Sequence, residues 1–179
     1  GYNIKDLVTG GKGKRFVFEE GAYLLLFVEL PTDTQLMEFQ GRLSDCMELP
    51  TNFTRDVIMK APTSDIMGSM TRSILTLGSY DKEKESLEIP NVLRQSMQLI
   101  AVFPMLAVYA YHAYCHYEKN ESMYIHRPEK DLSIAENFLR LLRPDTKFTE
   151  LEARVLDIAL LFPVAPLWFV VPKPSNSGL

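Results

Sequence analysis

The chain has 179 residues, of which 46% are hydrophobic and 23% charged, a composition that suits one folded domain and excludes a wholly disordered chain. Its 19 basic and 23 acidic residues give a net charge of -4, which offers no long-range attraction to nucleic acid or to an anionic lipid surface. We therefore expect neither nucleic acid nor a membrane as partner. Cys46 and Cys115 fit no metal or disulfide framework and no organellar presequence is visible, so we expect a cytoplasmic protein.

Apolar residues at helical spacing predict the first helices along the chain. A Thr32-x-x-Gln35 box, whose side chains satisfy free amides at a helix start, opens a helix before Pro50. Its inward residues are expected to be Leu36, Phe39 and Leu43. After the break at Pro62, a second amphipathic helix presents four apolar residues on one face: Ile66, Met70, Ile74 and Leu77. The charged run 81–88 predicts a solvated connection to the next helix.

A long apolar helix follows, and Pro90 suits its first turn. Its predicted inner face includes Leu93, Met97 and Ile100. Pro104 lacks the amide that a helix interior needs, so we expect this helix to be bent or divided there. The apolar stretch 99–115 contains Pro104 and His112 and is too short to span a membrane, so it predicts a buried core helix.

Two further capping boxes predict the last two helices. Ser133-x-x-Glu136 opens a helix that ends near Pro144, and Thr149-x-x-Glu152 opens the other. The residues expected to face inward on the first are Ile134, Phe138, Leu141 and Leu142. Those expected to face inward on the second are Leu151, Val155 and Ile158. Because the period-two alternation of strands is nearly absent, the sequence predicts an all-α fold.

His112 and His116 lie four residues apart on the long helix, so both rings could bind one metal ion, with Glu118 or His126 as a third ligand. The alternative, which we favour, is that these histidines lie at the boundary of the core and bond to backbone or water, because the segment lacks the His-Glu-x-x-His pattern. We therefore expect no metal site. Since all three histidines lie within 112–126, the sequence also assigns no base to a Ser or Cys nucleophile.

Several ordered segments resemble the citrate synthase family. They are Gly1 to Leu7 (GYNIKDL), Phe18 to Thr32 (FEEGAYLLLFVELPT), Asp131 to Leu139 (DLSIAENFL) and Leu151 to Leu160 (LEARVLDIAL). The resemblance extends to about Phe162, and we take residues 1–162 as the N-terminal part of the family's large domain. Val28 departs from the family pattern, which commonly has Gly at this position.

This resemblance implies an all-helical homodimer that condenses acetyl-CoA with oxaloacetate and water to give citrate and CoA, at the entry to the tricarboxylic acid cycle. It implies no metal and no cofactor, with acetyl-CoA as a substrate. A 2-methylcitrate synthase, which prefers propionyl-CoA, is the alternative within the family.

The resemblance assigns no catalytic residue to this chain. The family's first catalytic His lies in a His-x-x-His segment directly after the helix that we expect to end at Phe162, where this sequence has the prolines and small residues of 163–166. The second His and the catalytic Asp belong to later segments of the family, so we interpret 163–179 as a divergent Pro-rich tail and predict that the chain is inactive alone. Ser133 and Asn137 lie in a motif that approaches the oxaloacetate pocket in relatives. They are our candidates for residues that hold the substrate-binding residues in place without contacting the substrate themselves.

Two interpretations are open. In the first, the chain is part of a citrate synthase, an acyltransferase by family, that was cut or altered near Phe162. In the second, it is a non-catalytic helical module that binds a partner or regulates one. In the family, the apolar faces of these helices pack against the C-terminal half of the protein and against the second subunit. Without those partners the faces are exposed, and a few hundred square ångströms of exposed apolar surface lowers the free energy of unfolding by several kcal/mol. We therefore expect the isolated chain to be loosely packed or to self-associate, with a dimer through 99–115.

Overall fold

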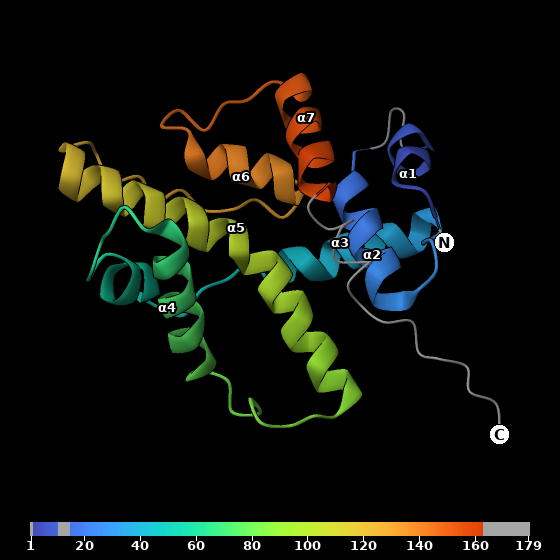
Figure 1. Cartoon of the computed structure of the whole chain (residues 1–179), viewed down its shortest axis with the longest axis horizontal. Coiled ribbons are helices and arrows are strands. Elements are labelled where there is room, and N and C mark those ends of the chain that lie inside the picture. The colour runs from blue at the N-terminus through green and yellow to red at the C-terminus, as the bar shows by residue number, and fades with distance from the viewer. Residues whose placement is uncertain (1, 11–14, 163–179) are drawn as a thin grey trace.

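The computed structural model describes residues 2–10 and 15–162, which form seven α-helices and one π-helical turn with no strand among them (Figure 1). The prediction of an all-α fold is therefore confirmed. The predicted divergent tail, 163–179, lies outside the described residues. The helices are α1 (Ile4–Gly10), α2 (Val17–Phe27), α3 (Asp33–Asp45), α4 (Ile66–Gly78), α5 (Ile89–Lys119), α6 (Ile134–Leu142) and α7 (Glu150–Leu161), with the π-helical turn η1 (Thr54–Ile58) between α3 and α4.

The long helix α5 forms the centre of the fold. Its 31 residues continue through Pro104 as one helix, and Figure 1 shows that this helix changes direction in its middle. Proline cannot donate to the carbonyl one turn before it, and its ring pushes against that carbonyl, so a bend is the expected result. Three residues near the bend are completely buried: Ala101, Val102 and Leu106. The predicted bent core helix is confirmed.

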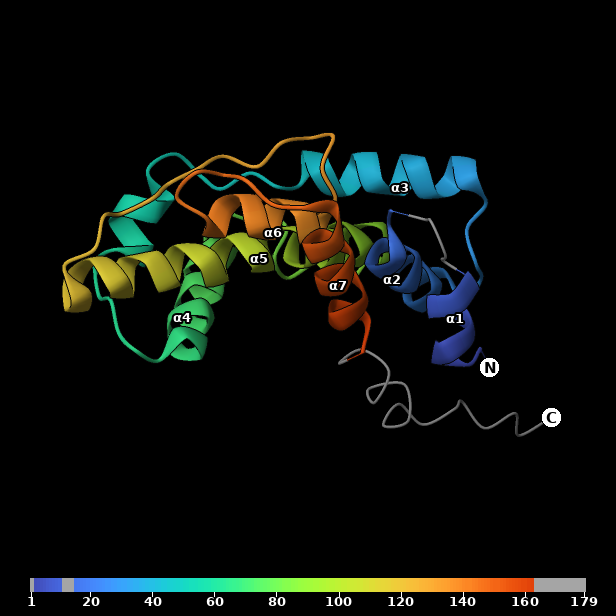
Figure 2. The same cartoon turned by 90° about the horizontal axis from the view of Figure 1, so that it is seen from above.

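The other helices pack around α5. Helix α4 and the turn η1 contact one side of α5, and α6 contacts the opposite side (Figures 1 and 2). Helix α2 contacts α3, α6 and α7 (Figure 2). One apolar cluster connects these elements and includes Phe39, Phe53, Met70, Ala101 and Leu141. The core therefore runs along α5 and extends to α3 at one side.

Three helices begin at capping boxes, as the sequence predicts. Ser133 Oγ accepts a hydrogen bond from the Glu136 amide at 3.2 Å, while the Glu136 carboxylate accepts one from the Ser133 amide at 2.9 Å. The same reciprocal pair of bonds is present at two further helix starts: Thr32 with Gln35, and Thr149 with Glu152. Because each box satisfies two amides that a helix start leaves free, these residues fix where α3, α6 and α7 begin.

The predicted inner faces are confirmed for α3, α4, α5 and α6, since each predicted residue is buried or packs against the core. The prediction for α7 is wrong at two residues, because Leu151 and Val155 are 71% and 61% exposed, while Ile158 is half-buried. The buried residues of this helix are instead Ala153, Asp157 and Leu161. Here a carboxylate of α7 binds the start of α2, and this contact turns the other side of α7 outward.

Helix α5 is long and apolar enough to cross a membrane by length and composition alone. The core helix of a water-soluble protein meets the same two criteria, and many residues of α5 belong to the apolar core. The expectation that no membrane is a partner stays a prediction.

Val28 ends α2 in the left-handed backbone conformation, with a φ of 63°. This conformation costs an L-residue about 1–2 kcal/mol, whereas glycine adopts it without strain. The residue is 72% exposed, so its side chain contributes little packing. We expect Val28→Gly to raise the free energy of unfolding by about 1 kcal/mol, measured by urea titration.

Asn120 provides the matched control, because it ends α5 with a φ of 55° and asparagine tolerates this conformation. Asn120→Gly is expected to change the free energy of unfolding by less than about 0.5 kcal/mol. An equal gain from both substitutions would show that strain at Val28 is not the cause.

Candidate functional site

Four ionisable side chains join α2, α6 and α7, and we call them the polar junction: Arg15, Glu19, Glu136 and Asp157. Asp157 lies on the buried face of α7 and is 2% exposed. Its two carboxylate oxygens accept hydrogen bonds from the Val17 and Phe18 amides, each at 2.9 Å. These amides belong to the first turn of α2, which has no acceptor for them within the helix. Asp157 therefore caps α2 from another helix.

Arg15 and Glu136 form the outer part of the polar junction. Arg15 Nε and Nη2 donate to different oxygens of the Glu136 carboxylate, each at 2.6 Å, and Nη2 also donates to the Asp131 carbonyl at 3.0 Å. The hydrogen bond to Glu136 raises the pKa of Arg15, so the guanidinium stays charged. Glu136 also closes the capping box of α6, so one carboxylate fixes both the helix start and the arginine.

Glu19 forms the inner part of the polar junction and is 1% exposed. Its Oε1 accepts a hydrogen bond from the Ile134 amide, at the start of α6, at 2.8 Å. Its Oε2 is buried and has no hydrogen-bond partner within 2–10 and 15–162. Burial raises the pKa of Glu19 to about 8, the Ile134 amide opposes this shift, and the nearby charge of Asp157 adds to it. Glu19 is therefore mostly a neutral acid at pH 7.

The two predicted pocket residues, Ser133 and Asn137, lie at the start of α6, and each is 1% exposed. Ser133 belongs to the capping box. Asn137 Oδ1 accepts from the Glu129 amide and its Nδ2 donates to the Glu129 carbonyl, both at 2.9 Å. The polar atoms of both residues thus hold α6 and the segment before it together. A role behind a substrate pocket stays a prediction.

All three histidines bond to backbone carbonyls. The pairs are His112 Nε2 with Leu141 (2.9 Å), His116 Nδ1 with Glu121 (2.7 Å) and His126 Nε2 with Pro144 (3.1 Å). Because a carbonyl oxygen only accepts, each of these nitrogens carries a proton. The favoured interpretation is confirmed for the bonds to backbone, but the boundary position holds only for His116 and His126, which are half-buried; His112 is 5% exposed and lies in the core. No group of three metal-ligating side chains occurs in the part of the chain that the structure describes.

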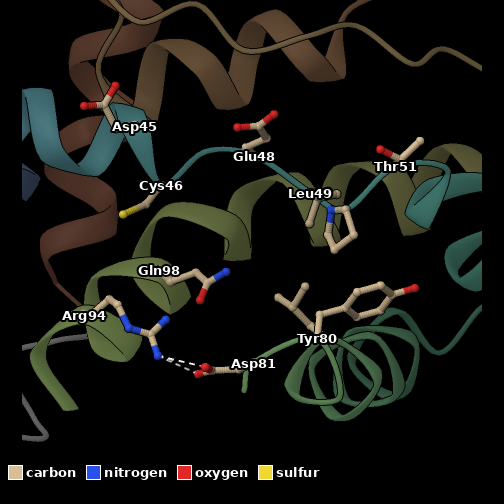
Figure 3. Close-up of a pocket in the computed structure, with 11 residues that line it drawn as sticks. Asp45, Cys46, Glu48, Leu49, Thr51, Tyr80, Asp81, Arg94 and Gln98 are labelled. Atoms are coloured by element: carbon tan, nitrogen blue, oxygen red, sulfur yellow. Dashed lines mark hydrogen bonds and ion pairs between the residues drawn. The ribbon is translucent and has the colours of Figure 1, made fainter. Parts of the chain in front are cut away.

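A cavity of about 500 Å³ lies between the segment after α3 and the helices α4 and α5 (Figure 3). Its wall includes Cys46, Leu49, Tyr80 and Gln98. At its edge, Figure 3 shows Arg94 facing Asp81, with Nη2 bonded to both carboxylate oxygens at 2.9 and 2.8 Å. Hydrogen bonds from Gln95 and Arg94 lower the pKa of Asp81 to about 2. The connection 81–88 is mostly exposed, as predicted, and Asp81 ties it to α5.

The cavity does not assemble a nucleophile with a base. Burial raises the pKa of Cys46, so its sulfur stays a thiol rather than the reactive thiolate. None of the described residues that line the cavity is a histidine. Among the residues described, the cavity therefore provides space and an ion pair, and the polar junction provides rigid helix starts.

Sequence reasoning missed Glu19 and Asp157 as residues that join helices. The signal that could have found them is an acid inside an apolar stretch, since Glu19 follows Val17-Phe18 and Asp157 lies among the apolar residues of 155–161. Their partners are 115 and 140 positions away in the chain, which no local pattern reveals.

Comparison with known proteins gives a consistent result. The family model described as "Citrate synthase, C-terminal domain" matches residues 1–163. The 2-methylcitrate synthase of Shewanella oneidensis is 29% identical over 162 residues, which cover 90% of this chain and 39% of the relative. The citrate synthase of Corynebacterium glutamicum is 28% identical over 143 residues, which cover 79% of this chain and 30% of the relative.

A solved structure shares the fold. The crystal structure of citrate synthase from Pyrobaculum aerophilum matches with a TM-score of 0.73 at 23% sequence identity, covering 90% of this chain and 39% of that chain. The chain therefore spans less than half the length of these relatives.

Asp157→Asn tests the cap on α2. An asparagine accepts only through Oδ1, so one of the amides of Val17 and Phe18 loses its acceptor while the volume of the side chain is kept. A buried unpaired amide costs about 1–3 kcal/mol, and we expect a loss of that size in the free energy of unfolding at neutral pH. Urea titration measures the loss.

Glu118→Gln, at an exposed residue near the end of α5, makes the same chemical change without a cap and is expected to stay within about 0.5 kcal/mol of the parent chain. Equal effects of the two substitutions would contradict the capping role of Asp157.

Proposed function

Because the chain belongs to the citrate synthase family, we propose that it provides part of the helical scaffold of an enzyme that condenses an acyl-CoA with oxaloacetate. The family match over residues 1–163 carries this proposal, and the fold shared with a citrate synthase supports it. In the family this reaction yields citrate and CoA and feeds the tricarboxylic acid cycle, and we assign the same role to the enzyme that contains this scaffold.

The acyl-CoA substrate is acetyl-CoA in this proposal, with propionyl-CoA as the alternative. Relatives named citrate synthase and 2-methylcitrate synthase match the chain at 28% and 29% identity, so overall similarity supports both. The condensation itself needs acid and base groups held within hydrogen-bond reach of the substrates, and the proposal includes no metal or cofactor.

We also propose that this chain does not catalyse the reaction alone. Its sequence contains three histidines, and each has one ring nitrogen bonded to a backbone carbonyl. Residues 163–166, where the family has its first catalytic His, are Pro-Val-Ala-Pro. The groups that move protons in the family therefore have no counterpart at this position.

A thiol-release assay tests this proposal. The purified chain is mixed with oxaloacetate and either acetyl-CoA or propionyl-CoA, and free CoA is followed with a thiol reagent after the signal from Cys46 and Cys115 is subtracted. We expect the rate of a protein-free blank, because residues 163–166 do not carry the His of the family's first catalytic segment. The Shewanella 2-methylcitrate synthase serves as positive control. CoA release that depends on oxaloacetate and exceeds the blank would contradict the proposed inactivity.

A second candidate function is a non-catalytic helical module that pairs with another copy of itself. Three apolar or aromatic residues of α5 share one side of the helix and are partly exposed: Leu99 (38%), Phe103 (41%) and Tyr111 (41%). Their spacing of four and eight residues keeps them on one side of α5, and we call these three residues the stripe; exposed apolar residues grouped on one face are a feature of interaction sites. We propose a homodimer in which the stripes of two copies pack together, within the region 99–115.

Phe103→Asp tests the dimer, because a carboxylate at the centre of the stripe would be buried without a partner. Sedimentation velocity of the parent chain is expected to show a dimer, and that of the variant a monomer at the same concentration. Met37→Asp on α3 is the control, since Met37 is 59% exposed outside the stripe and the variant is expected to remain a dimer. A monomeric parent chain, or a dimeric Phe103→Asp variant, would count against this interface.

We propose a cytoplasmic location as well. Cys46 and Cys115 are both free thiols, one half-buried and one buried. Free thiols of this kind are typical of reducing compartments, which supports the proposal.

A further inference from the structure

We propose that the polar junction is a pH-sensitive latch between α2, α6 and α7, in which neutral Glu19 keeps the three helices together and ionised Glu19 loosens them. Glu19 reaches the first amide of α6 from within α2, through a bond of 2.8 Å. Its other carboxylate oxygen is buried with no hydrogen-bond partner among the residues described. A negative charge on this side chain would therefore be enclosed by protein on the side where nothing stabilises it.

The charged groups around Glu19 come from each of the packed elements. Glu136 of α6 and Asp157 of α7 are the nearby negative groups, and Arg15, from the segment before α2, is positive. Arg15 already bonds to both oxygens of Glu136, and the positive charge of Arg154 of α7 acts on Asp157, whose pKa burial raises and this charge lowers. Within the described part of the chain, a charge on Glu19 would thus have no cation of its own and would meet two other carboxylates. Repulsion and burial act in the same direction.

The pH range of the latch follows from the two states of the chain. Glu19 has an ordinary pKa of 4.5 when unfolded, and burial raises the pKa to about 8 in the folded chain. Between these values the folded chain holds one proton more than the unfolded chain, so the stability that Glu19 provides falls as the pH rises. It is fully present below pH 4.5 and is lost once the pH passes about 8. In mildly alkaline solution the closed junction then contains an unpaired buried charge.

Amide hydrogen exchange on the whole chain measures the latch where it acts. The reporters are the amides of Ile134, Val17 and Phe18, which bond to Glu19 and Asp157. After correction for the intrinsic effect of pH on exchange, we expect their protection factors to fall at least about tenfold between roughly pH 6.5 and pH 9, equivalent to one pKa unit.

Two variants separate Glu19 from other causes. Glu19→Gln keeps the size of the side chain and cannot ionise, so its reporter amides are expected to show flat protection over the same pH range. Glu20→Gln changes the next residue, which is half-buried and outside the polar junction, and is expected to follow the parent chain. A tenfold fall that persists in Glu19→Gln, or no fall in the parent chain, would overturn the latch.

If Glu19→Gln does not fold, the protection factors of different amides within the parent chain test the latch instead. The backbone amide of the buried residue Ser73, in α4, then serves as the reference. Helix α4 packs mainly against α5 and η1 rather than against α2, α6 or α7. A fall in protection confined to Ile134, Val17 and Phe18 supports the latch. A fall of equal size at Ser73 overturns it, because the whole domain would then be losing stability.

Discussion

The capping of helix starts by acidic side chains from other helices is the interaction on which the rest of the structure depends. Asp157 of α7 holds the first amides of α2, and Glu19 of α2 holds the first amide of α6. Each bond satisfies a donor that its own helix leaves free, and each also sets the position of one helix against another. The resulting approach of α2 to α7 is so close that Leu161 occupies the space of any side chain at Gly21.

The bond from Glu19 to the start of α6 links the helical scaffold with the residues proposed to lie near a substrate pocket. Ser133 and Asn137, the residues that the resemblance places near a substrate pocket, lie at the same helix start that Glu19 caps. Both are buried, and both hold backbone groups rather than reaching into open space. Within the part of the chain that the structure describes, both residues thus stabilise the scaffold.

Much of the fold could be predicted from sequence because its signals are local. The capping box of Ser133 and Glu136 spans only four residues of chain, and Pro104 bends α5 through the carbonyl one turn away. The inward face of α7 could not be predicted in the same way. Its apolar residues Leu151 and Val155 point outward because a polar residue, Asp157, makes the buried contact, and that contact depends on residues 140 positions earlier.

The bond between Asp157 and the start of α2 also has a consequence for how the chain is made. A ribosome adds roughly 5–20 residues per second, so α2 leaves it on the order of ten seconds before the helix that caps it. During that interval the first turn of α2 has free amides and the helix lacks two of its neighbours, α6 and α7. Synthesis of this protein therefore passes through a stage in which α2 has uncovered apolar surface and free amides until α7 has left the ribosome.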